Sequence, residues 1–141
     1  MADSEYHTGI DRATADGIVS AARTGLGDTL RSVLHFTPAS FDVLYVRRDL
    51  YENHEAARDA KSRLVAIERS GFAEKPLRTA LGEESFERTS IGPYRFTVRF
   101  HDNGFVVRVL EGDTGVLLTA DEMDVRAFEE AAVAIRGLLT E

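Results

Sequence analysis

The chain has 141 residues, 43% of them hydrophobic, and 24 acidic against 17 basic side chains give it a net charge of -7. This length suits one domain with its own core, and the absence of cysteine excludes disulfides and cysteine-ligated zinc. The acidic balance argues against general nucleic-acid binding, which requires a basic face, and no apolar run is long enough to predict membrane insertion.

The charged residues also suggest a salt environment. Only Lys61 and Lys75 are lysines, and the other cations are arginines. Dense carboxylates keep a surface hydrated, and high salt screens their mutual repulsion, so the composition predicts a halophilic protein. A mildly acidic mesophilic protein with an arginine bias from a GC-rich genome is the alternative. The first residues lack the basic and apolar regions of a signal peptide, so we expect a cytoplasmic protein.

The first half of the chain predicts a helix and a pair of strands. Residues 1–11 are polar and unpatterned and are interpreted as a flexible tail, with a single α+β domain over residues 12–141. Apolar spacing predicts a helix from Thr14 to the glycines at 25 and 27. Residues 32–46 favour a β-hairpin because they are rich in β-branched and aromatic side chains, although a short helix that starts at Thr37-Pro38 is the alternative.

The second half begins with a long helix over about residues 50–70, for which Asp49 is the expected N-cap. An alanine-rich apolar stripe marks its predicted buried face; it comprises Ala56, Ala57, Ala60, Leu64 and Ile67. Residues 72–90 are expected to be mostly connection. A final helix follows the predicted capping box at residues 119–122, with Val125, Phe128, Ala131, Ala132, Ile135 and Leu138 as its buried stripe.

Residues 92–120 show the clearest pattern in the chain. Apolar and polar side chains alternate from Tyr94 to His101, which predicts a half-buried strand. Asn103-Gly104 predicts a tight type I′ hairpin turn to a second strand, and a third strand follows the turn at residues 112–115. With Asn103-Gly104 as the two turn residues, the predicted register places Arg99 directly opposite Arg108.

The predicted element order is α-β-β-α-β-β-β-α. It indicates an α+β fold with a central antiparallel sheet of about five strands and helices on its faces. This order resembles that of roadblock/LC7-like domains, relatives of the profilin-like sandwich. The resemblance implies a homodimer that forms through a sheet edge and the middle helix, but it is a fold analogy and carries no catalytic residues.

Three short runs are similar to a family of small haloarchaeal proteins of unknown function. They are LGDTLRSV at residues 26–33, LYVRRDL at residues 44–50 and YRFTVRF at residues 94–100. The similarity covers about residues 21–139. It implies a high-salt, cytoplasmic protein and assigns no catalytic residue.

The candidate site is the arginine face of the predicted hairpin, which holds Arg95, Arg99, His101 and Arg108. Like charges on opposed strands are destabilising unless something neutralises them. Carboxylates of a covering helix, such as Glu55, Asp59 or Glu68, are the first explanation. A subunit interface and an anion- or ligand-binding site are the alternatives.

A second cluster consists of Arg47 and Arg48, which can meet a phosphate or an acidic partner, although a solvated charge beside a helix cap is the simpler interpretation. The histidines lack metal-ligand spacing, so neither a metal nor a cofactor is expected. No nucleophile motif is present, which favours a non-enzymatic role but leaves an unrecognised active site open. We therefore expect a homodimer that acts through protein–protein contact in regulation or signalling, with an anion sensor or an enzyme as alternatives.

Overall fold

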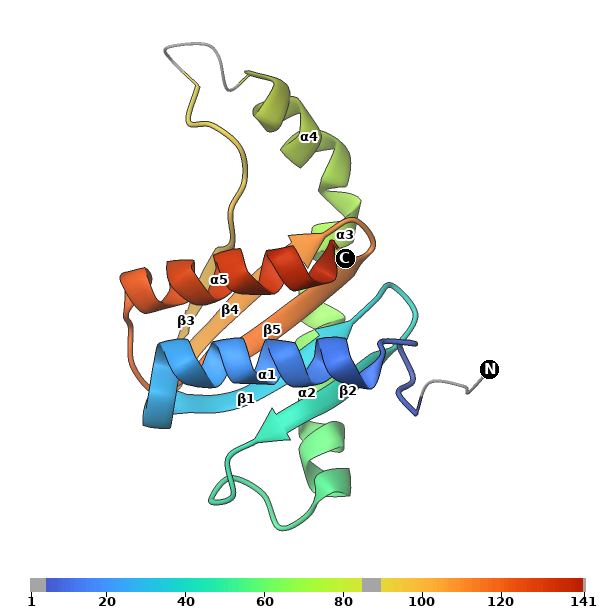
Figure 1. Ribbon diagram of the computed structural model, residues 1–141, viewed down its shortest axis with the longest axis vertical. Helices are drawn as coiled ribbons and strands as arrows, with labels where there is room; N and C mark the ends of the chain where they lie inside the picture. Colours follow the sequence, from blue (N-terminus) through green and yellow to red (C-terminus); the bar gives the residue numbers. More distant parts are fainter. Residues whose placement is uncertain (1–4, 85–89, 141) are drawn as a thin grey trace.

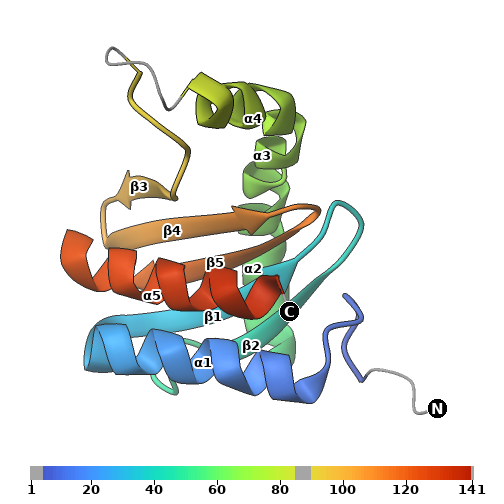
Figure 2. The same ribbon diagram turned by 45° about the horizontal axis from the view of Figure 1, so that its top comes forward.

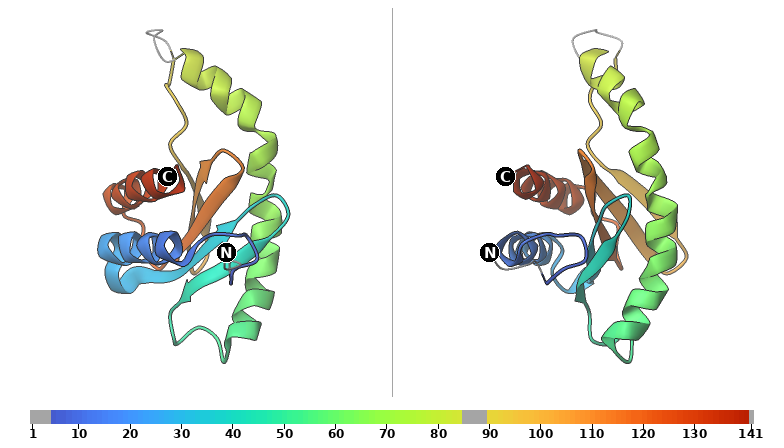
Figure 3. Two further views of the ribbon diagram at one scale, coloured as in Figure 1. Left: turned by 45° about the vertical axis from the view of Figure 1, so that its right-hand side comes forward. Right: turned by 90° about the vertical axis from the view of Figure 1, so that its right-hand side faces the viewer.

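The computed structural model describes residues 5–84 and 90–140 of the chain. Its centre is a five-stranded antiparallel sheet in the order β2-β1-β5-β4-β3. Helices α1 and α5 lie side by side on one face of the sheet, and α2 crosses the other face (Figures 1 and 3). The α+β class and the five-stranded sheet predicted from the sequence are therefore confirmed.

The first helix, α1 (Arg12–Leu26), begins where Asp11 accepts a hydrogen bond from the Thr14 backbone N–H at 2.7 Å. A one-turn 3-10 helix, η1 (Gly27–Thr29), leads into β1 (Leu30–Phe36), and β2 (Phe41–Val46) returns beside it. The hairpin interpretation of residues 32–46 is therefore confirmed.

The N-terminal segment, expected to be a flexible tail, is described from residue 5. The backbone N–H groups of His7 and Thr8 both donate to the Asp42 carboxylate at 2.8 Å, and Ile10 is buried in the core. Residues 7–11 therefore lie against the sheet. Hydrophobic periodicity could not predict this, because one buried apolar residue, Ile10, makes no periodic pattern and the hydrogen bonds to Asp42 and His35 are polar contacts.

The middle helix, α2 (His54–Glu68), begins later than predicted. Asn53 caps it by accepting from the Ala56 N–H at 2.8 Å, so the assignment of Asp49 as N-cap is wrong. The buried face also differs from the predicted alanine stripe, because Ile67 is 54% exposed. The residues that face the sheet are Ala57, Lys61, Val65 and Glu68.

Two short helices follow α2 where connection was expected. They are α3 (Ser70–Ala73), which continues the line of α2, and α4 (Lys75–Glu83), which turns away from that line beyond the sheet (Figure 2). The part of that expected connection at residues 85–89 lies outside the described residues. The chain then returns to the sheet as β3 (Thr97–His101), which is one of its two edge strands; β2 is the other.

The last three strands form the predicted meander, with β4 (Gly104–Glu111) between β3 and β5 (Thr114–Ala120). The final helix, α5 (Val125–Leu139), is capped by Asp124, which accepts from the Ala127 N–H at 3.0 Å. The predicted capping box is wrong, because Thr119 lies inside β5. The buried stripe of α5 agrees from Phe128 to Ile135, whereas Val125 is exposed.

The sheet separates two hydrophobic clusters. The larger lies under α1 and α5 and includes Ile18, Val107 and Phe128. The smaller lies under α2 and includes Phe36 and Val65. None of the helices within residues 5–84 and 90–140 combines the length and the apolar character needed to cross a membrane.

Candidate functional site

The arginines of the β3–β4 hairpin meet a buried carboxylate, and the predicted register of this hairpin is wrong by two residues. His101 pairs with Gly104 and Thr97 with Arg108, so the turn residues are Asp102 and Asn103. None of the described non-glycine residues has a positive φ, and Gly104 has none either, so the turn cannot be type I′. Gly104 serves close packing instead: a Cβ there would lie 2.8 Å from the Ala120 carbonyl oxygen.

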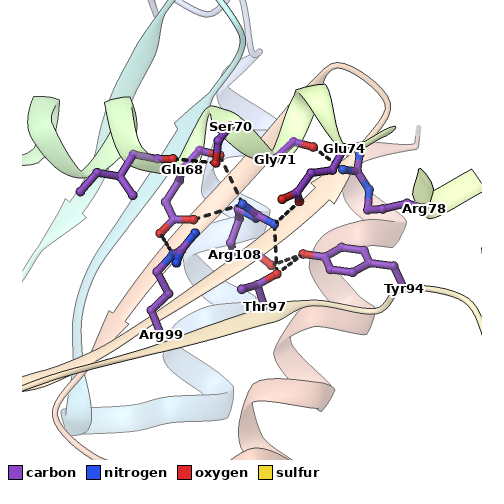
Figure 4. A network of polar contacts seen from close by, with 10 residues as sticks. Glu68, Ser70, Gly71, Glu74, Arg78, Tyr94, Thr97, Arg99 and Arg108 are labelled. Atoms are coloured by element: carbon purple, nitrogen blue, oxygen red, sulfur yellow. Dashed lines mark hydrogen bonds and ion pairs between the residues drawn. The ribbon is translucent and has the colours of Figure 1, made fainter. Parts of the chain in front are cut away.

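A shift of two residues leaves each side chain on the same face of the sheet. Arg99 and Arg108 therefore still share the α2 face, as diagonal neighbours (Figure 4). Glu68 of α2 reaches both of them: its Oε2 accepts from Arg99 Nε at 2.6 Å, and its Oε1 accepts from Arg108 Nη1 at 3.3 Å. The prediction that a helix carboxylate neutralises these arginines is confirmed for Glu68.

Arg108 is the centre of this network. Its Nη2 donates to Glu74 Oε1 at 3.2 Å and to Thr97 Oγ1 at 3.1 Å. The Tyr94 hydroxyl donates to the Arg108 carbonyl oxygen at 3.2 Å. Burial lowers the pKa of Arg108, but Tyr94, Glu68 and Glu74 raise it by more, so the net shift is upward.

The helix backbone approaches Arg108 at a glycine. A Cβ at Gly71 would lie 2.6 Å from Arg108 Nη1, so the close approach of α3 to Arg108 depends on the missing side chain. The Gly71 carbonyl oxygen also accepts a short hydrogen bond from Arg78 of α4. The network therefore attaches all three helices of this segment to the sheet.

The four charges of the network balance: two carboxylates, Glu68 and Glu74, and two arginines, Arg99 and Arg108. Glu68 is 0% exposed and Arg108 is 3% exposed, whereas Arg99 and Glu74 reach solvent. A buried arginine with two carboxylates around it presents little free charge to an incoming anion. The arrangement acts mainly as a clamp between α2 and the β3–β4 hairpin, with Arg99 as its solvent-facing end.

Two predicted members of the arginine face, Arg95 and His101, take no part in this network. Arg95 precedes β3 and its Nη2 donates to Glu129 of α5 at 3.4 Å, on the opposite side of the sheet. His101 is exposed at the end of the hairpin. The structure therefore brings Arg99 and Arg108 together and places Arg95 on the α5 side of the sheet. His101 stays on the face of Arg99 but points into the groove beside Lys61 rather than into the network.

The second predicted cluster is divided as well. Arg47 donates to Asp121 at 2.5 Å, to Asp49 at 2.7 Å and to the Asp28 carbonyl oxygen at 3.0 Å. Its hydrogen bond lowers the pKa of Asp121, which also accepts from Arg31 at 2.9 Å. Arg48 is exposed and forms no ion pair with any residue that the structure describes.

Several buried polar residues were not among the predicted site residues. His35 is 3% exposed, its Nδ1 lies 2.8 Å from Thr8 Oγ1, and burial lowers its pKa to about 4. Lys61 is 7% exposed on α2. In an alternating or helical pattern, charged residues are assigned to the solvent-facing side. The one sequence signal was spacing: Lys61 and Glu68 are seven residues apart, which places them on the same face of a helix.

A metal site needs several histidine, cysteine or carboxylate side chains close together. Within the described residues, no group of three or more histidine and carboxylate side chains is placed to hold a metal ion. His35 and His101 lie on β1 and β3, with β5 and β4 between them.

The fold and this network define a small α+β domain with an antiparallel sheet whose layers are joined by a buried ion-pair cluster. A family model described as a domain of unknown function, DUF7522, matches residues 16–140. The chain therefore belongs to the DUF7522 family, in agreement with the resemblance to a family of unknown function. A comparison with curated proteins found no match.

Proposed function

We propose that this protein is a homodimer that acts through protein–protein contact, and that two copies pair along the free edge of β3. The supporting observation is that β3, one of the two edge strands of the sheet, carries the exposed residues Arg99, Phe100 and His101. His101 and Gly104 flank a two-residue turn, so they form the hydrogen-bonded closing pair. Strand alternation then turns the backbone N–H and C=O groups of Val98 and Phe100 away from β4.

Outward-facing backbone groups on an edge strand are a template for another strand. An antiparallel pair about a two-fold axis through Arg99 would place Val98 opposite Phe100 of the partner subunit. Aromatic and β-branched residues form favourable cross-strand pairs. The two Arg99 side chains would then be opposite each other, and each is already paired with its own Glu68 at 2.6 Å.

Two further considerations support this proposal. The roadblock-like element order implies dimers through a sheet edge and the middle helix, and α2 offers Ile67, which is 54% exposed. Phe100 is 72% exposed although it stacks edge-on against Phe105 at 5.3 Å, so pairing would bury the remaining aromatic surface. The same proposal includes a halophilic protein, which the acidic composition supports. It also includes a non-enzymatic role and a cytoplasmic location, which rest on the sequence expectations alone.

The test is the molar mass by light scattering in multimolar KCl. We expect twice the chain mass of 15.6 kDa. Val98→Pro removes an outward-facing N–H without removing a bond to β4, and proline is tolerated at such positions of edge strands. We expect this variant, and Phe100→Lys, to be monomeric. Val133→Lys, a substitution at another exposed apolar residue, is the matched control and should remain dimeric.

A monomeric wild-type protein at micromolar concentration would overturn the dimer. A dimer that survives both Val98→Pro and Phe100→Lys would overturn the assignment of the interface to β3. Circular dichroism of each variant separates loss of pairing from loss of the fold.

A further inference from the structure

A second charged feature lies on the α2 face, away from the clamp at Arg108. Lys61 of α2 lines a groove of about 590 Å³ together with Leu64 of the same helix and Arg31 of β1. The β3–β4 hairpin forms the other wall, from Phe100 to Val106. Although it lines this groove, Lys61 is only 7% exposed.

Lys61 lacks a counter-charge among the residues that the structure describes. No carboxylate there forms an ion pair or hydrogen bond with its ammonium group, and its one assigned contact is with the Tyr51 ring, 5.6 Å from the ring centroid. Glu68, two turns further along the same face of α2, is instead paired with two arginines. Burial of an unpaired ammonium group costs roughly several kcal/mol. The stability of the fold therefore does not explain why a lysine is buried at position 61.

The surroundings of Lys61 are cationic. Burial, and then the charge of Arg31, lower the pKa of Lys61 to about 8. Arg31 Nη1 donates a hydrogen bond to Asp121 Oδ1 at 2.9 Å. The other guanidinium N–H groups of Arg31 form no hydrogen bond within the described structure. The other titratable groups that line the groove are His101 and Asp102, and both are exposed.

The groove also has an apolar wall, to which Leu64 and Val106 of the α2-side cluster contribute. Two cationic side chains beside such a wall match a ligand with an anionic head and an apolar or planar body. We propose that the groove between α2 and the β3–β4 hairpin binds a small organic anion, whose carboxylate or phosphate is held by Lys61 and Arg31. The groove shares Phe100 and His101 with the proposed β3 interface. Lys61 and Arg31 lie on α2 and β1, so anion binding by these two side chains does not require the dimer.

The first experiment uses the small number of lysines as an internal comparison. Pyridoxal 5′-phosphate forms an imine with a lysine amine and releases water, and borohydride then reduces the imine to a stable secondary amine. Lys75, whose side chain is 51% exposed, is the exposed reference. The labelled lysines are identified by peptide mass spectrometry at pH 7.5, in the lowest KCl concentration that keeps the chain folded.

We expect Lys61 to be labelled faster than Lys75, because Arg31 holds the phosphate while the aldehyde reaches Lys61. Pyridoxal without the phosphate should label Lys61 about tenfold less, the ratio that one ion pair of about 1.4 kcal/mol gives. A lowered pKa alone would favour both reagents equally, so this ratio isolates anion binding. Equal labelling of Lys61 by the two reagents, or preferential labelling of Lys75, would overturn the proposal.

The second experiment measures binding at equilibrium with phenyl phosphate and benzoate as probes. At least one of them should raise the melting temperature of the wild-type protein, and the larger shift identifies the head group. Lys61→Met should abolish this shift, and Lys75→Met should keep it. Lys61→Met should also be at least as stable as wild type without a probe, because it removes an unpaired buried charge.

Two results of the second experiment would overturn the proposal. One is the absence of a shift with either probe, and the other is a shift that Lys61→Met retains. If Lys61→Met does not fold, protection of wild-type Lys61 from pyridoxal phosphate by phenyl phosphate or benzoate decides the matter. Loss of dimerisation in the Val98→Pro protein with unchanged labelling of Lys61 would separate this site from the proposed interface.

Discussion

The buried ion pair at Glu68 makes the most direct prediction about stability. Glu68→Gln keeps the shape of the side chain but removes the charge that lies between Arg99 and Arg108. Arg108, whose side chain is 4% exposed, would then keep only Glu74 as an ionic partner, at 3.2 Å. Loss of one partner from a buried pair costs about 3–5 kcal/mol, and the remaining Glu74 places this variant near the lower value, about 3 kcal/mol.

The comparison with Arg99→Ala makes this prediction specific. The Arg99 side chain is 42% exposed, so its removal should cost only about 1 kcal/mol. Asp59→Asn, an exposed carboxylate change on the same helix, should stay within about 0.5 kcal/mol of wild type. The measurement is urea unfolding at constant KCl concentration, where the midpoint and the slope give the free energy of unfolding.

A Glu68→Gln cost no larger than that of Arg99→Ala would refute the view that burial determines the strength of this pair. A double variant, Glu68→Met with Arg108→Met, provides an independent check. It should cost less than the sum of the two single changes, because neither charge is then left buried alone.

The remaining predictions concern Gly71 of α3, pH and salt. Gly71→Ala should lower the free energy of unfolding in urea by about 2 kcal/mol, because its Cβ would lie 2.6 Å from Arg108 Nη1. Gly82→Ala is the control: its Cβ would meet only Pro93 at 4.0 Å, so it should be neutral or stabilising. Equal effects of the two substitutions would contradict this packing argument. The lowered pKa of His35, about 4, means that the unfolded chain binds more protons between pH 6.5 and 4, so stability should fall by up to about 3 kcal/mol as the pH falls through that window. His35→Gln should remove this component of the pH dependence in thermal unfolding, and an unchanged pH profile would count against it. The acidic composition predicts that the fold loosens below roughly molar KCl, and full stability in dilute buffer would rule out the halophilic interpretation.

Periodicity alone was sufficient for most of the secondary structure. Alternation at residues 94–101 and the β-branched residues of 41–46 indicate strands, because a half-buried strand needs apolar side chains at every second position. The first of these strands begins at Thr97 rather than at Tyr94. The apolar spacing around Ile18 and Phe128 indicates the two helices that cover one face. These patterns are local, so they do not depend on which elements become neighbours.

Helix caps and the hairpin turn were predicted less well. Several residues near a helix end can act as its N-cap. Asp49 pairs with Arg47, and Asn53 takes the cap. Asn103-Gly104 has a typical turn sequence, yet the hairpin is displaced by two residues, and Gly104 lies where the chain passes the Ala120 carbonyl oxygen. That choice depends on the neighbouring strand β5, which a two-residue pattern does not contain.

What the sequence by itself determined is the α+β class, the five strands and the shared face of Arg99 and Arg108, since each follows from a period of two or 3.6 residues. Tertiary structure decided which charges are buried. Glu68 and Lys61 both face the sheet from α2, and only packing decides that one meets two arginines and the other meets an open groove. The physical reason is that the cost of burying a charge depends on the partners that other elements bring to it, and those partners are distant in the chain.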